Sequence, residues 1–236
     1  MSVQADPNRP PLLLLHGALG SIETLSPLAE RLKANRLIFS LNFSGHGGTP
    51  FEGPFTVPRF TDEVMDMLDR VQVDQVDVFG YSLGGYVALH LALQHPTRVR
   101  KVYTLATQFD WTPESAAREV QQLDPQQIEA KVPHFAEQLR QRHHPQSWRQ
   151  NLRYSADLMR RLGAGEALNG EHFQRISQPV VIARGEQDGM LEAEESQRIA
   201  ELLPQGRFHS LPDCPHPLEQ VPIEPLATDL EAFLEE

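Results

Sequence analysis

The sequence predicts an α/β fold, with a doubly wound, mainly parallel sheet of about six strands and a helical insertion. Six short, nearly continuous apolar runs alternate with helical patterns over most of the chain, as strands buried on both faces and their crossover helices require. One long interval, residues 108–178, lacks a convincing strand and holds several helical patterns separated by prolines. The length of 236 residues and the hydrophobic fraction of 40% suit one globular domain with a small insertion.

Strands and helices are expected to alternate along the chain. The apolar runs that indicate strands are 11–17, 36–43, 76–82, 99–107, 179–188 and 206–213. Helical periodicity is present at about 22–34, 58–71, 83–95, 192–203 and 222–234. Parallel strands need such crossover helices, which then cover both faces of the sheet.

The interval at 108–178 divides the chain into a predicted core, residues 1–107 and 179–236, and a predicted helical cap. The cap holds nine Lys or Arg and nine Asp or Glu residues. It is therefore neutral, and the core carries the whole formal charge of −11. The simplest interpretation of the arginines in the cap is a solvated helix surface. His143 and His144 lie in such a polar stretch, which predicts solvated imidazoles.

Charge and cysteine content limit the partners and the compartment. A formal net charge of −11 disfavours nucleic acid or an anionic membrane surface as a partner. The single cysteine, Cys214, excludes an intrachain disulfide and suits a reducing compartment. The start, "MSVQADPNRPPLLLLHG", has no basic segment followed by a long apolar one. We expect a cytoplasmic protein with a small-molecule substrate and no metal or cofactor, and the sequence leaves a homodimer open.

A serine stands at a sharp junction in the chain. Gly80-Tyr81-Ser82-Leu83-Gly84 fits the pattern G-x-S-x-G, with an apolar run before it and a helical pattern after it, and this is the context in which the pattern indicates a nucleophile. Small residues two before and two after the serine are required because the strained turn is crowded. A glycine-rich turn with an accidental serine is the alternative, which the flanking segments disfavour.

A nucleophilic serine needs a base and an acid that orients the base. His216 follows the last apolar run and precedes the last helix, which places it at the carboxyl edge of the sheet, where Ser82 also lies. Asp188 follows the preceding strand in "VVIARGEQDGM". Asp110 also follows a strand and is the rival, but Asp188 gives the chain order Ser, Asp, His that is expected for this arrangement.

An oxyanion hole would complete the site, and it needs two backbone N–H donors. Leu83 supplies one, because it is the residue after the serine and begins a helix. The second donor is expected after the first strand, in "LLLLHGALGS", where the N–H of Ala18 or of Leu19 faces the same edge.

Taken together, these segments resemble the serine-nucleophile branch of the α/β-hydrolase fold superfamily. The segments that carry the resemblance are "HGALGS" (16–21), "GHGGT" (45–49), "GYSLGG" (80–85), "GEQDG" (185–189) and "HPLEQVP" (216–222). They span nearly the whole chain apart from the interval at 108–178, where this family carries its variable cap. The set is specific for the fold and only weakly specific for the substrate.

The resemblance implies a role for each candidate residue. Ser82 would be the nucleophile, His216 the general base and then acid, and Asp188 its orienting partner. Ala18 and Leu83 would form the oxyanion hole. Three departures accompany it: Asn42 and Ser44 stand where many relatives have Asp and Pro, Pro215 stands where glycine is common before the histidine, and only about ten residues precede the first strand. The last departure predicts a sheet trimmed to about six strands.

The leading hypothesis is a cofactor-free serine hydrolase, most simply a carboxylesterase for small esters or acyl compounds. Leu19 and Tyr81, which neighbour Ala18 and Ser82, and Arg153 in the cap are the substrate-binding candidates. A first alternative is a lyase or a carbon–carbon bond hydrolase of the same fold whose substrate carboxylate is held by cap arginines such as Arg153. A second alternative is a small-molecule-binding signalling protein with little or no turnover.

Overall fold

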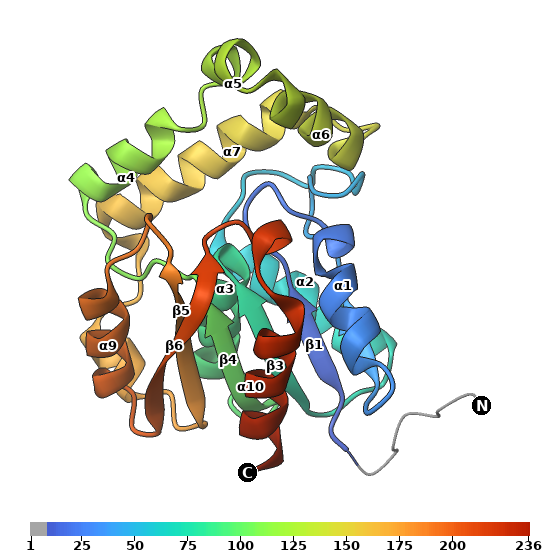
Figure 1. Cartoon of the computed structure of the whole chain (residues 1–236), viewed down its shortest axis with the longest axis vertical. Coiled ribbons are helices and arrows are strands. Elements are labelled where there is room, and N and C mark those ends of the chain that lie inside the picture. The colour runs from blue at the N-terminus through green and yellow to red at the C-terminus, as the bar shows by residue number, and fades with distance from the viewer. Residues whose placement is uncertain (1–8) are drawn as a thin grey trace.

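A single parallel sheet organises the structure, a computed structural model that describes residues 9–236. Helices cover both faces of this sheet (Figure 1). The strands are β1 (Leu12–Leu15), β2 (Ile38–Ser40), β3 (Val76–Tyr81), β4 (Val99–Leu105), β5 (Val180–Gln187) and β6 (Gly206–Pro215). Their order in the sheet is β2-β1-β3-β4-β5-β6, and every neighbouring pair is parallel. The predicted fold class and strand number are confirmed, and only the ends of the strands differ.

Five helices flank the sheet in two layers. They are α1 (Ile22–Leu32), α2 (Val57–Arg70), α3 (Leu83–Gln94), α9 (Ala193–Leu202) and α10 (Ile223–Glu235). Residues of α1 and α10 pack into one apolar core, and those of α2, α3 and α9 pack into the other. The alternation of side chains along a strand explains both cores, since Leu12 and Leu14 of β1 face the first and Leu13 and Leu15 face the second.

Four helices of the insertion, α4 to α7, form a layer above the carboxyl edge of the sheet (Figure 1), and its last helix, α8, packs against α9. Its helices are α4 (Pro113–Gln121), α5 (Pro125–Lys131), α6 (Pro133–His143), α7 (Trp148–Arg161) and α8 (Gly170–Gln174), with a π-helical turn at Leu162–Glu166. The prolines Pro113, Pro125 and Pro133 begin their helices, where the missing N–H has no helical partner to lose.

The insertion shares part of its core with the sheet. Leu158, Leu162 and Phe173 belong to the same apolar cluster as α2 and α3, so these residues bury their side chains against the core. The division into a core and a separate cap stays a prediction, and residues 1–8 of the predicted core lie outside the described part of the chain. Within residues 9–236 no helix combines the length and apolar character that a bilayer crossing requires.

Three buried histidines join the cap to the core. His16, His46 and His143 are all fully buried, with ring centroids 5.1 Å apart for His16 and His46 and 5.7 Å apart for His46 and His143. His143 Nδ1 accepts a hydrogen bond of 3.2 Å from the N–H of Gly47. The expectation of a solvated His143 was therefore wrong, because α6 turns this side chain toward the core loop.

We expect the protein to lose stability on acidification because of these histidines. Burial lowers the pKa of His16 and of His143 to about 4 in the folded protein. Between about pH 6.5 and pH 4 the unfolded chain takes up protons on them and the folded chain does not. Above that window the two histidines cost the protein no free energy of unfolding. Within it, the free energy of unfolding falls by about 1.4 kcal/mol per pH unit for each histidine.

Urea unfolding at pH 7.5, 6 and 5 measures this loss. His143→Gln is expected to show a shallower decline than the wild type, because a neutral amide has no proton to gain. His134→Gln serves as the matched control, since His134 is an exposed residue of the same helix and its loss should leave the decline unchanged. Equal pH dependence in wild type and His143→Gln would contradict the assignment.

Candidate active site

Ser82 lies in a strained turn between β3 and α3. Its φ of 52° and ψ of −118° are unusual for a residue with a side chain. The turn leaves no room beside it, because a Cβ on Gly80 would lie 2.4 Å from the carbonyl oxygen of Gly84. A Cβ on Gly84 would lie 2.2 Å from the carbonyl oxygen of Leu15. Both glycines are therefore required for the serine to take this conformation.

Backbone hydrogen bonds hold the turn in place. The N–H of Ser82 donates to the carbonyl of Leu105 at 2.8 Å. The carbonyl of Ser82 accepts bonds from the N–H of Gly85 at 2.9 Å and from Thr107 Oγ1 at 3.0 Å. Strand β4 and the first turn of α3 thus fix the serine from two sides, which offsets the strain.

Two backbone segments offer N–H donors beside Ser82. Leu83 is the first residue of α3, so its N–H has no helical partner and lies at the positive end of the helix dipole. After β1 the chain makes a tight turn, which the N–H of Gly20 closes by a 3.1 Å bond to the carbonyl of Gly17. The N–H groups of Ala18 and Leu19, which lie within this turn, take no part in that hydrogen bond. Ala18, Leu19 and Leu83 all line the cavity that contains Ser82.

His216 is paired with the buried carboxylate of Asp188. The imidazole Nδ1 lies 2.8 Å from Asp188 Oδ2, and Asp188 Oδ1 accepts a 2.9 Å bond from the N–H of Met190. Burial pushes the pKa of Asp188 upward, but the hydrogen bond and charge of His216 outweigh it, so this pKa lies below its ordinary value. The rival, Asp110, instead forms an ion pair with Arg198.

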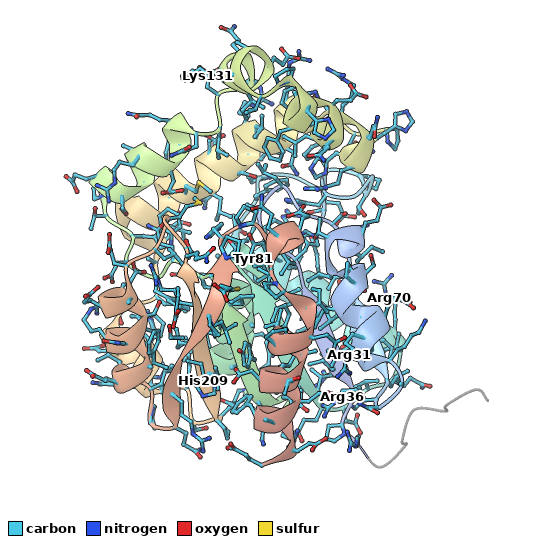
Figure 2. All side chains as sticks on the ribbon, viewed as in Figure 1. Arg31, Arg36, Arg70, Tyr81, Lys131 and His209 are labelled. Atoms are coloured by element: carbon cyan, nitrogen blue, oxygen red, sulfur yellow. The ribbon has the colours of Figure 1, made fainter. Side chains whose placement is uncertain are left out.

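The loop that carries His216 is held from two directions. Tyr81 O–H donates a 2.8 Å hydrogen bond to the carbonyl of His216, and Figure 2 places Tyr81 at the top of the sheet beneath the cap. From the cap, Arg142 Nη2 donates to Glu219 at 2.9 Å and Arg142 Nη1 donates to the carbonyl of Leu19 at 2.9 Å. One arginine of α6 therefore contacts both loops that flank Ser82.

A cavity of about 430 Å³ brings the candidate residues together. Ser82, His216, Ala18, Leu19 and Leu83 line it from the core. Its other walls are mainly apolar side chains of the cap and of the loops, among them Trp111, Leu123, Ile128, Phe135, Leu158, Met159 and Leu162. A volume and lining of this kind suit an apolar small molecule with a polar reacting group.

The three predicted substrate-binding residues have different outcomes in the structure. Leu19 and Tyr81 line the cavity, whereas Arg153 does not. Its guanidinium lies over the ring of Tyr154, 5.4 Å from the centroid, and the residue is exposed. The prediction for Arg153 was wrong because α7 turns this position to solvent.

Sequence reasoning missed two charged residues that line the cavity, Arg142 and Glu119. Both lie in polar cap helices, where the sequence pattern does not show which polar residue faces inward. Neither belongs to a motif that could have identified it. Only the packing of α4 and α6 above the sheet distinguishes them from their solvated neighbours.

Comparisons with known proteins identify the family that shares this architecture. Residues 10–218 match the family model described as alpha/beta hydrolase fold. A pimeloyl-[acyl-carrier protein] methyl ester esterase from Aromatoleum aromaticum is 30% identical over 89% of this chain and 92% of its own. The esterase YbfF from Escherichia coli is 28% identical over a shorter stretch, 44% of this chain and 41% of its own.

Solved structures show the same fold at lower sequence identity. A putative lipase from Acinetobacter baumannii has a TM-score of 0.83 at 17% identity and covers 98% of this chain and 85% of its own. The enol-lactonase from Burkholderia xenovorans has a TM-score of 0.77 at 18% identity and covers 99% and 95%. With the match to the family model and to the first esterase, this chain belongs to the alpha/beta hydrolase fold family and is a hydrolase.

Proposed function

We propose that the protein is a carboxylic ester hydrolase that uses Ser82, His216 and Asp188 as a catalytic triad. One observation carries the proposal: the strained turn of Ser82 opens into the same apolar cavity as His216, whose other ring nitrogen is bonded to the buried Asp188. This combination supplies a nucleophile, a base and a group that orients the base.

The reaction follows from these positions. Ser82 Oγ attacks the ester carbonyl carbon while His216 Nε2 takes the hydroxyl proton, and the resulting imidazolium is stabilised by Asp188. The N–H groups of Ala18 and Leu83 stabilise the oxyanion. His216 then gives its proton to the leaving alcohol, which leaves an acyl-enzyme. A water molecule, activated by His216, releases the acid and restores the serine.

The substrate class follows from the cavity wall. Apolar cap side chains such as Leu123, Ile128 and Phe135 suit an acyl chain without charge along its length. The similarity to a methyl ester esterase supports a small alcohol part. We therefore propose small esters of aliphatic acids as substrates.

The contacts of the cap arginines favour the ester proposal over the alternative in which these arginines bind a substrate carboxylate. Arg149 pairs with Glu129 and Arg160 pairs with Asp157 on the surface. Arg142, which does line the cavity, is already bonded to Leu19 and Glu219. The described cap thus offers a substrate carboxylate no arginine that is both in the cavity and free of an acidic partner.

Initial rates on p-nitrophenyl esters of increasing acyl length test the proposal. We expect saturable, repeated turnover with a maximum at the chain length that the cavity accommodates. A fluorophosphonate should also stop turnover: Ser82 Oγ displaces its fluoride, so the peptide that contains Ser82 gains the mass of the phosphonyl group. Folded protein that neither turns over any ester nor reacts with the fluorophosphonate would overturn the proposal and favour the non-catalytic binding protein.

A further inference from the structure

The cavity contains a carboxylate that the described protein does not neutralise. Glu119 of α4 lines the cavity together with Ser82 and His216, and its side chain is half-buried. Within residues 9–236 its carboxylate takes part in no hydrogen bond or ion pair, and Arg118 and His216 act on it only through longer-range electrostatic interaction. The carboxylate is therefore open to a ligand in the cavity, and a cationic ligand group could pair with it there.

The other charges in the cavity wall cancel. Arg142 is bonded to Glu219 at 2.9 Å, and both residues line the cavity. Among the residues that line the cavity, Glu119 therefore contributes, in addition to the charge of Asp188 behind His216, one negative charge without a partner. Because the remaining wall is mainly apolar, the field of that charge is weakly screened there.

The position of Glu119 indicates which part of the substrate it meets. Glu119 and His216 line the same cavity, and the two groups interact electrostatically across it. His216 must deliver its proton to the leaving alcohol, so we take the charge that acts on His216 to act also on the alcohol part of the ester. The acyl chain then extends from Ser82 along the apolar wall.

We propose that Glu119 makes the enzyme prefer esters whose alcohol part is cationic and discriminate against those whose alcohol part is anionic. This inference rests on the proposed ester hydrolysis and adds the charge of the leaving group to it. Glu119 is a specificity-determining residue in this proposal and takes no part in proton transfer.

Three butyrate esters measure the preference. Butyrylcholine is cationic, 3,3-dimethylbutyl butyrate has the same shape without charge, and a butyrate ester of a hydroxy acid of similar length is anionic. Burial raises the pKa of Glu119 above its ordinary value, so the assays are run at pH 8, where the carboxyl is ionised. We expect kcat/KM to be on the order of fivefold higher for the cation than for its neutral isostere, and lower again for the anion.

Glu119→Gln keeps the shape and removes the charge, so it should lower the ratio of cationic to neutral ester severalfold, toward one. Glu114→Gln removes a charge from an exposed residue of the same helix and should leave the ratio as in the wild type. Raising the salt concentration should reduce the wild-type ratio and not that of Glu119→Gln.

A wild-type ratio near one, or a ratio that Glu119→Gln does not change, would overturn the proposal. An equal change of all three rates would also overturn it, since Glu119 would then act through His216.

Binding separates this inference from the proposed hydrolysis. On a Ser82→Ala background the choline ester should bind about fivefold more tightly than its isostere, and addition of Glu119→Gln should remove the difference. Wild-type protein that shows the binding preference but hydrolyses no ester would refute the hydrolysis and keep the role of Glu119. Hydrolysis of the esters together with equal dissociation constants for the choline ester and its isostere would support the proposed hydrolysis and refute the role of Glu119.

Discussion

Replacement of Ser82 by alanine is expected to lower kcat on p-nitrophenyl esters by a factor on the order of 10³ or more. The change removes only the hydroxyl that attacks the carbonyl. The donors from Ala18 and Leu83 and the apolar cavity remain, so the variant should keep a small rate above that of the uncatalysed reaction. Initial rates with ester saturating, measured for wild type and Ser82→Ala side by side, give this ratio directly.

The loss in Ser82→Ala must be separated from loss of fold. Alanine has a Cβ like serine, so the strained backbone at φ 52° is neither relieved nor worsened by the change. Urea unfolding should therefore give a midpoint close to that of the wild type, and a non-hydrolysable ketone analogue should still bind. Turnover near the wild-type rate in Ser82→Ala would show that another group is the nucleophile.

The positions of the core residues could be predicted because a parallel sheet places the ends of all its strands at one edge. Ser82 follows β3, Asp188 follows β5 and His216 follows β6, so their convergence follows from strand order alone. The near-continuous apolar runs identified those strands, and the glycines around Ser82 identified the turn. In the structure this convergence appears as the 2.8 Å contact between His216 and Asp188 and as the shared cavity.

The cap could not be predicted in the same way. Its helices are polar on more than one side, so the pattern does not show which side is buried. Arg153 was expected to face the substrate and is exposed, while Arg142 and Glu119 line the cavity without any sequence signal. His143 was expected in solvent and is buried against the loop at Gly47. These outcomes depend on how α4, α6 and α7 dock on the core, which is a property of tertiary packing.

Replacement of Asp188 by asparagine is expected to lower kcat by a factor on the order of 10³ to 10⁴ with little change in shape. The N–H of Met190 donates to Oδ1 of Asp188, so the amide oxygen of asparagine takes that position and its NH₂ group faces His216. The NH₂ group donates to Nδ1, which places the ring proton on Nε2. In this tautomer His216 cannot accept the proton of Ser82, and the imidazolium also loses its counter-charge.

The rival carboxylate provides the matched control. Asp110→Asn makes the same chemical change at a residue that follows another strand but pairs with Arg198 on the surface. We expect its kcat to equal that of the wild type, and both variants should unfold at similar urea concentrations. A large loss of kcat in Asp110→Asn together with a normal kcat in Asp188→Asn would show that the orienting acid is Asp110 and that its assignment to Asp188 is wrong. Since both rates come from one assay on the same ester, the comparison decides between the two carboxylates independently of the identity of the natural substrate.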